Sequence, residues 1–158
     1  MIPEIALLAD RPELVDAVVD ALQVEWPEWY GLSSRDEIQN EVRGRAQSDE
    51  IPMTLVAMSA DRMVGTVSLS PVSIPTHTHL SPWLSGLWVE AEGRGKGAGS
   101  ALVAACRAHA ERLGFERLYA ATASAQGLFR RDGWVRFDTV ELPAHPGETI
   151  EVFRFDLT

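Results

Sequence analysis

Cysteine and lysine each occur only once in the 158 residues, as Cys106 and Lys96. A single cysteine excludes an internal disulfide and a zinc cluster of several thiolates. We expect Cys106 to be a small buried hydrophobic residue and expect no metal site. No run approaches the roughly 20 apolar residues that cross a membrane, and the N-terminal stretch lacks the basic start and cleavage site of a secretory signal. We therefore expect a cytoplasmic protein with no membrane partner.

Basic residues are also scarce, because 14 lysines and arginines face 23 acidic residues and give a formal net charge of −9. The backbone of nucleic acid demands positive charge, so this balance argues against a nucleic-acid partner. The acidity serves solubility in the first place, and it is weakly consistent with a cationic substrate. The length suits one domain. No repeat or long linker divides the chain, so we expect a single domain over residues 1–158.

Hydrophobic periodicity predicts the order of the elements. A strand at 4–9 precedes a helix over about 11–25 and a second, polar helix capped by Ser33 or Ser34. Alternating residues after Ile51 predict two strands joined by a tight turn at 61–62, and a proline-rich loop follows at 71–82. The remainder predicts a strand at 83–89, a helix from 97 to Gly114, a strand at 115–123, a short helix at 124–133, and strands at 134–142 and 149–157.

This order predicts a mixed α/β sheet. Hairpin-length turns make most strands antiparallel, whereas the βαβ unit at 84–122 makes one pair parallel. Trp88 lies five positions after Trp83, and because this spacing is odd, a regular strand would place the two side chains on opposite faces of the sheet.

A glycine-rich strip, GRGKGAG at 93–99, lies between the strand ending at Val89 and the helix after it. Free N–H groups and the dipole of a helix start form an anion site there, and glycines let a phosphate approach the backbone. A Walker loop is excluded because Gly97 follows Lys96 where Ser or Thr is needed. A dinucleotide fingerprint lacks its acidic residue near 118. Nucleotide binding in another form, or glycines used for packing alone, remain as alternatives.

The same strip contains the pattern R-x-x-G-x-G. Together with the longer stretch LWVEAEGRGKGAGSALVAAC and the later LFRRDGW, it resembles the GNAT superfamily of acyl-CoA-dependent N-acyltransferases. The resemblance implies a GNAT-like fold with helices on both faces of the sheet. It also implies acetyl-CoA as cosubstrate, and transfer of an acetyl group to a primary amine by direct attack in a ternary complex. The late strands often pair two copies in this family, so we expect a homodimer.

The resemblance also implies a coenzyme site. The loop that holds the diphosphate of CoA corresponds to Arg94, Gly95, Lys96, Gly97, Ala98, Gly99 and Ser100. The pantetheine arm is expected along the preceding strand at Leu87, Trp88 and Val89. That strand is expected to diverge from the next one and admit the thioester.

Two residues depart from the family pattern. Phe129 stands where many members carry a tyrosine that protonates the leaving thiolate, and Thr122 stands where an asparagine is often found. Another donor or water then serves the thiolate, or the protein is a non-catalytic acyl-CoA-binding module. Because a thiol has a pKa of about 8.5, full protonation in the transition state is less necessary than for an alkoxide.

The acceptor side of the reaction is less defined by the sequence. Glu90, Glu92, His77 and His79 are candidates to take a proton from the amine, or else they are solvated turn and loop residues. The aromatic residues Trp26, Trp29 and Tyr30 are candidates to hold a small cationic amine by cation–π contacts, or else they close the core between two helices. The identity of the acceptor does not follow from the sequence.

Overall fold

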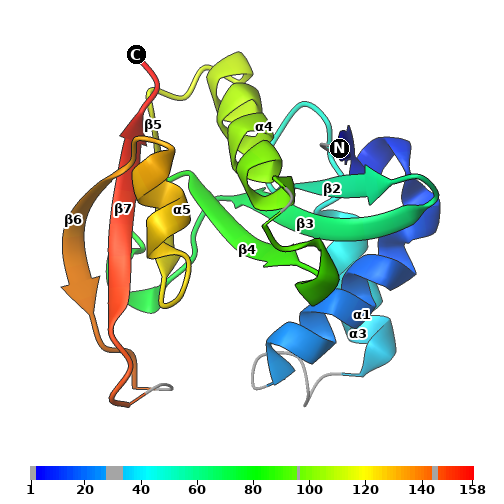
Figure 1. The fold of residues 1–158 in the computed structure, drawn as a ribbon, viewed down its shortest axis with the longest axis horizontal. Coiled ribbons are helices and arrows are strands. Elements are labelled where there is room, and N and C mark those ends of the chain that lie inside the picture. Colours follow the sequence, from blue (N-terminus) through cyan, green and yellow to red (C-terminus); the bar gives the residue numbers. More distant parts are fainter. Residues whose placement is uncertain (1–2, 28–33, 96, 144–145) are drawn as a thin grey trace.

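The structure, a computed structural model, describes residues 3–27, 34–95, 97–143 and 146–158. Its centre is a seven-stranded sheet with the order β1-β2-β3-β4-β5-β7-β6 (Figure 1). The strands are β1 Glu4–Leu7, β2 Met53–Ser59, β3 Arg62–Ser70, β4 Trp83–Val89, β5 Arg117–Thr122, β6 Val135–Val140 and β7 Ile150–Asp156. The β4–β5 pair is parallel and the other neighbouring pairs are antiparallel. The predicted mixed sheet with one parallel unit is confirmed.

Helices cover both faces of this sheet. Alternate residues of β2 divide between two cores: Leu55 packs with α4 (Ala98–Arg112), whereas Val56 packs with α1 (Val15–Glu25) and α3 (Arg35–Gly44). The short helix α5 (Gln126–Arg131) lies on the α4 side, where its Phe129 joins the same core. Short 3₁₀ turns occupy Leu8–Asp10, Pro12–Leu14, Pro75–His77 and Ala91–Gly93. The α4 face and the α1/α3 face are therefore distinct environments.

The side-chain hydroxyl of Ser34 caps α3. Ser34 is one of the two serines that the sequence predicts as the cap of this helix. It accepts a hydrogen bond from the backbone N–H of Glu37, and the Glu37 carboxylate accepts one from the N–H of Ser34. This reciprocal capping box satisfies two N–H groups that the first helical turn leaves unpaired. The start of α3 is thus fixed by local sequence.

Trp83 and Trp88 lie on the same face of β4, so the prediction of opposite faces is wrong. Trp83 pairs with Ser70 and Trp88 with Thr66, and those two β3 residues share one face. The register between β3 and β4 shifts between Thr66 and Ser68, where β4 carries an additional residue. Gly86 adopts a positive φ of 61° in this bulge, a conformation that glycine accepts without strain. The additional residue reverses the alternation of side chains and brings both indoles to the α1/α3 face.

Strands β4 and β5 are joined over only a short distance. Their register covers Trp83 with Tyr119 and Leu84 with Ala120. Beyond these pairs β4 turns away from β5, and Figure 1 shows the two strands diverging toward the C-terminal end of β4. The sheet is therefore divided into a β1–β4 part and a β5–β7–β6 part, with an opening between them.

Gly65 allows the close approach of β3, β4 and α4 on the α4 face. A Cβ atom at this position would lie 2.9 Å from the Trp88 carbonyl oxygen and 2.9 Å from Cδ1 of Leu102. Because the carbonyl is backbone, we expect Gly65→Ala to lower the free energy of unfolding by about 1–3 kcal/mol. Gly44→Ala is the matched control, since no atom lies within 4 Å of its Cβ position. Urea denaturation should separate the two variants, and equal stability would contradict this reading of the packing.

Candidate active site

A cleft of about 620 Å³ occupies the opening between β4 and β5. Its floor is formed by β4 from Leu84 to Leu87 and by the end of β5 with the turn after it, up to Ala125. Leu22 of α1 and the C-cap residue Trp26 border it on one side, and Phe129 of α5 borders it on the other. The cleft thus reaches both faces of the sheet at the place where its two parts separate.

The open edge of β4 presents backbone groups near the end of the strand. The N–H of Glu90 donates to the Val64 carbonyl on β3 at 2.9 Å. Backbone groups alternate in direction along a strand, so the N–H and C=O of Val89 point away from β3. The Val89 carbonyl accepts a hydrogen bond from Nε of Arg94 at 3.1 Å. Arg94 is thereby held beside the edge that the sequence predicts for the pantetheine arm.

The start of α4 carries N–H donors without an acceptor inside the helix. The first bond of the helix runs from the Ala101 N–H to the Gly97 carbonyl at 2.9 Å, so the N–H groups of Ala98, Gly99 and Ser100 have no helical acceptor. No side chain of the described residues caps this end, and its first turn holds no acidic residue. Gly97 has a φ of 88°, which favours glycine.

Such a helix start favours an anion, because the N–H groups and the helix dipole act in the same direction. Gly95 also has a positive φ, of 81°. Lys96, the remaining basic residue predicted for this loop, lies outside the described residues. The described part of the loop thus has a helix start and glycines with positive φ, and the anion site that the strip predicts stays a prediction.

Phe129 is a core side chain at the edge of the cleft. It is 2% exposed, and its ring centroid lies 5.0 Å from that of Trp134 and 5.7 Å from that of Phe153. These contacts give Phe129 a structural role in the core under α4. A phenyl ring offers no hydrogen-bond donor, so a proton donor for chemistry in the cleft has to come from another residue or from water.

Glu90, Glu92 and His79, the predicted candidates for a base, do not border the cleft. The Glu90 carboxylate pairs with Arg62 at 2.8 Å, and the Glu92 carboxylate lies 4.0 Å from the same guanidinium. His79 is exposed and stacks on the buried His77 with ring centroids 5.9 Å apart. Any role of these three groups in proton transfer would run through water.

His77 joins the 71–82 loop to the edge strand β6. Its Nε2 lies 2.8 Å from a carboxylate oxygen of Asp138, and its Nδ1 lies 2.7 Å from the Thr76 hydroxyl. The hydrogen bond from His77 lowers the pKa of the Asp138 carboxyl below its ordinary value. These contacts show that His77 holds the 71–82 loop against β6, which is a structural role.

The end of the cleft on the α1/α3 side has more acidic than basic residues. Trp26, one of the candidates from the sequence, borders it, and so do Glu25, Glu41 and Glu148 together with Arg45. Glu41 forms an ion pair with Arg45, the C-cap residue that follows α3. Trp29 and Tyr30 lie outside the described residues. The sequence does not point to Glu41 and Glu148. These two residues lie more than a hundred positions apart in the chain, and no local pattern links them to one site.

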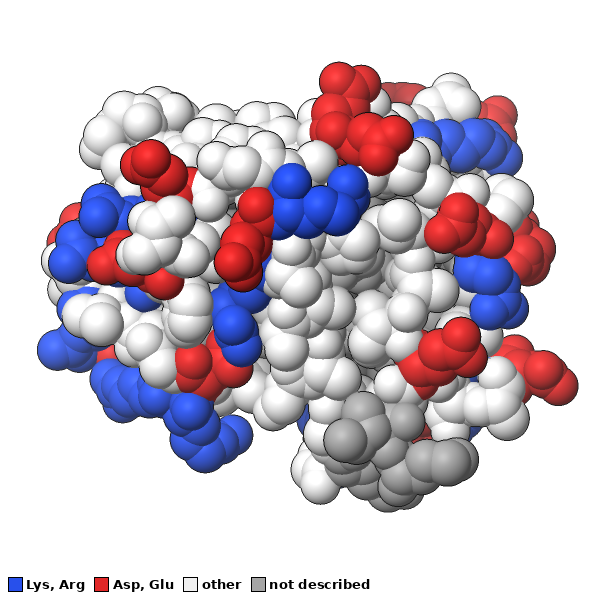
Figure 2. Space-filling model, turned by 90° about the horizontal axis from the view of Figure 1, so that it is seen from above, with Lys and Arg blue, Asp and Glu red and all other residues white. Residues whose placement is uncertain are grey.

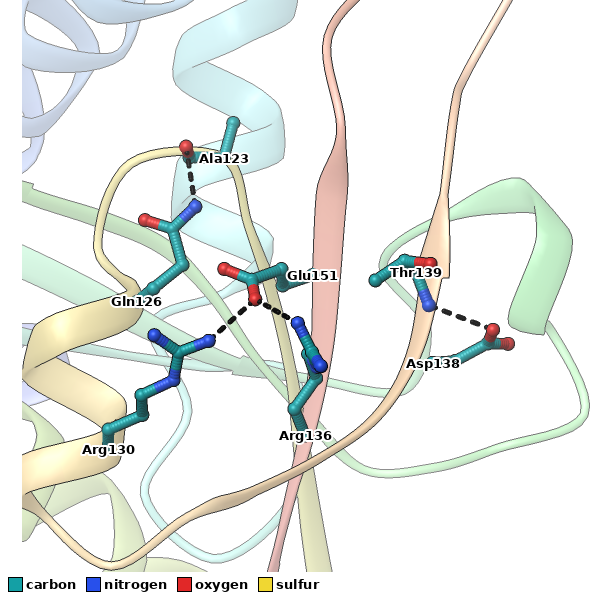
Figure 3. A network of polar contacts seen from close by, with 7 residues as sticks. All are labelled: Ala123, Gln126, Arg130, Arg136, Asp138, Thr139 and Glu151. Carbon is teal, nitrogen blue, oxygen red and sulfur yellow. Dashed lines mark hydrogen bonds and ion pairs between the residues drawn. The ribbon is translucent and has the colours of Figure 1, made fainter.

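Glu151 connects three elements beside the cleft. It is 7% exposed, and one of its carboxylate oxygens accepts hydrogen bonds from Arg130 and Arg136, each at 2.8 Å. Figure 3 shows Arg130 reaching it from α5 and Arg136 from β6, while the amide of Gln126 donates to the Ala123 carbonyl. These bonds hold α5 against β7 and β6. They also fix the turn that follows β5.

The net charge of the protein is −9, but the face in Figure 2 has no large acidic patch. Acidic side chains (red) and basic side chains (blue) are interspersed there. Among the described residues, no group of three or more His, Cys, Asp or Glu side chains is arranged to hold a metal ion. Within the same residues, no helix has the length and apolar character needed to cross a membrane.

Comparisons with known proteins agree with this arrangement. Among solved structures, an aminoglycoside 6'-N-acetyltransferase complexed with coenzyme A has 18% identity and a TM-score of 0.77, with 98% of this chain and 97% of that chain covered. An aminoglycoside 6'-N-acetyltransferase from Enterococcus faecium has 18% identity and a TM-score of 0.75 over the same shares. An N-acetyltransferase from Staphylococcus aureus has 14% identity and a TM-score of 0.76, with 98% and 99% covered. At these identities the likeness shows a shared fold.

A search of curated proteins gives no match. The family model described as the acetyltransferase (GNAT) family matches residues 15–134, which is well over half of the sequence. The chain therefore belongs to the GNAT acetyltransferase family and is an acyltransferase.

Proposed function

We propose that this protein transfers an acetyl group from acetyl-CoA to a primary amine of a small cationic acceptor. Two observations carry the proposal: the start of α4, with N–H donors that lack a helical acceptor, lies against the end of β4 at Val89, and acidic residues line the cleft that opens further back along β4. An anionic coenzyme and a cationic amine would therefore meet at the opening between β4 and β5.

The coenzyme would bind on the α4 face. The N–H groups of Ala98, Gly99 and Ser100 would hold the diphosphate, with Arg94, Gly95, Lys96 and Gly97 forming the loop around it. The pantetheine arm would follow the open edge of β4 at Leu87, Trp88 and Val89. The Val89 N–H would donate to the acetyl carbonyl and stabilise the negative charge that develops on its oxygen.

The amine would enter from the α1/α3 face. Trp26, Glu25, Glu41 and Glu148 border that end of the cleft together with Arg45, and the excess of carboxylates over the one guanidinium favours a positively charged molecule. An ammonium has to lose a proton before its nitrogen attacks the carbonyl. Glu90, Glu92 or His79 would receive this proton through water. The aminoglycoside acetyltransferases of similar fold make aminoglycosides a reasonable first group of amines to assay.

We expect acetyl-CoA and CoA to stabilise the protein, and NAD and ATP to leave it unchanged. A ligand at about a hundred times its Kd stabilises the folded state by about 2.7 kcal/mol, which raises the Tm of a domain of this size by roughly 5–10 °C. Thermal denaturation with each of the four ligands is the measurement. Absence of a shift with both CoA compounds would overturn the proposal.

A second candidate function is acyl-CoA binding without transfer, and the buried Phe129 in place of a tyrosine favours it. The two candidates differ in turnover. Release of free CoA from acetyl-CoA in the presence of a panel of polyamines, amino acids and aminoglycosides measures transfer directly. Binding of acetyl-CoA with no amine-dependent release across that panel would favour the binding module.

A further inference from the structure

Acetyl transfer needs a group that stabilises the leaving sulfur. When the carbon–sulfur bond breaks, the electron pair stays on sulfur and a thiolate forms in the cleft. Phe129 has no donor to offer. Tyr119 is the one tyrosine within the described residues, and it packs on the other face of the sheet with Trp83 and Val152. A hydrogen-bond donor therefore has to be found elsewhere on the α4 face.

Thr122 is in the right place for this role. It is the last residue of β5 and borders the cleft, two positions beyond the last pair that joins β5 to β4. Leu118 and Ala120 belong to the core under α4. Because side chains alternate along a strand, Thr122 lies on that same face, where the coenzyme is proposed to bind.

The hydrogen bonds of Thr122 determine where its proton is directed. Its hydroxyl oxygen accepts from the backbone N–H of Ser124 at 3.2 Å and from that of Ala125 at 2.9 Å. A hydroxyl has two lone pairs and one proton, so the oxygen is fully used and the O–H points away from the turn. No described residue accepts this O–H. Two N–H donors also polarise the oxygen, which makes the O–H a stronger donor.

We infer that the Thr122 hydroxyl donates the hydrogen bond that stabilises the leaving thiolate, in the place of the tyrosine that this chain lacks. This inference rests on the proposed acetyl transfer. The amine nitrogen forms a bond to the carbonyl carbon, and the carbon–sulfur bond breaks toward sulfur. An aliphatic hydroxyl is a far weaker acid than a thiol, so the proton stays on the Thr122 oxygen. The thiolate takes its proton from water, and the amine proton leaves to water.

Neighbouring groups support an anion at this position. Glu151 pairs with Thr122 across β5 and β7, and its negative charge would oppose a thiolate. Arg130 and Arg136 both bind that carboxylate and bring two positive charges to the same place. Four serines also border the cleft: Ser70, Ser73, Ser85 and Ser124. The hydroxyls of Ser70 and Ser85 lie 2.8 Å apart on the opposite face of the sheet and are hydrogen-bonded to each other.

The direct measurement is the pKa of the CoA thiol when CoA is bound to the protein. The pH-dependent difference in ultraviolet absorbance, taken against the protein without CoA, follows the thiolate, and the single thiol of the protein does not titrate in the same range, because burial raises the pKa of Cys106 to about 12. We expect bound CoA to have a thiol pKa about one unit below that of free CoA. Thr122→Ser should keep this shift, and Thr122→Val should remove it.

Activity gives a second readout. We expect kcat to fall about tenfold to a hundredfold in Thr122→Val, with a smaller change in the KM for acetyl-CoA, and to be nearly restored in Thr122→Ser. Thr139→Val is the matched control, since Thr139 is exposed on the edge strand β6. It should behave as wild type in both measurements.

The outcomes separate this inference from the proposed function. Failure of CoA to bind the wild-type protein would overturn the proposed function itself. Binding of CoA with an unshifted thiol pKa in wild type would overturn the role of Thr122 alone, whatever the variants do. A thiol pKa shift that survives in Thr122→Val would also overturn the role of Thr122. The threonine would then serve only to hold the turn after β5.

Discussion

Replacing Ser100 by glutamate is expected to weaken CoA binding by about a hundredfold or more, while the free protein becomes slightly more stable. Ser100 is exposed in the first turn of α4, and its N–H is one of the donors without a helical acceptor. A carboxylate there would interact favourably with the helix dipole by about 0.3–1 kcal/mol. The same carboxylate would repel a bound diphosphate, which carries at least two negative charges.

The opposite signs of the two effects make the Ser100 variant informative. Isothermal titration with CoA gives the affinity, and urea denaturation gives the stability of the free protein. Ser100→Gln is the control, because it has the size of glutamate without the charge and should bind CoA almost as wild type does. High salt should narrow the difference between the two variants. If glutamate binds CoA as tightly as glutamine, the diphosphate lies elsewhere.

The backbone of the proposed coenzyme loop is the part of the site that the sequence predicts best, because its signals are local. The positive φ values of Gly95 and Gly97 and the N–H groups without a helical acceptor after them follow from a few consecutive residues between a strand and a helix. The capping box at Ser34 is local in the same sense. Such features depend on neighbours in the chain, so a pattern read along the sequence reaches them.

The carboxylates that Glu41 and Glu148 bring to the cleft and the orientation of the β4 side chains are not predicted, because both depend on residues far apart in the chain. Glu41 and Glu148 meet at the cleft only after α3 and the end of the β6–β7 connection are packed around it. The bulge at Gly86 turns Trp83 and Trp88 to one face, although their spacing alone predicts two. A single additional residue in a strand moves every later side chain to the opposite face of the sheet, and the local sequence pattern does not predict it.

Replacing Trp83, one of these two tryptophans, by alanine is expected to cause a large loss of stability. Trp83 is fully buried, packs against Tyr119 with ring centroids 5.4 Å apart, and donates from Nε1 to the Leu80 carbonyl at 2.7 Å. It also belongs to the short register that joins β4 to β5. We expect Trp83→Ala to cost about 3–5 kcal/mol, a large share of the 5–15 kcal/mol that stabilises a typical domain. The Tm should fall by about 10 °C or more.

Trp88→Ala is the matched control, because Trp88 lies on the same strand and face but is only partly buried. Its expected cost is about 1–2 kcal/mol. Trp83→Phe keeps an aromatic ring but leaves the Leu80 carbonyl without its donor, so its loss of stability should lie between those of Trp83→Ala and Trp88→Ala. Thermal and urea denaturation of the three variants give this order. Equal losses for Trp83→Ala and Trp88→Ala would mean that the β4–β5 junction does not depend on Trp83, and that the opening of the cleft is fixed by the bulge at Gly86 instead.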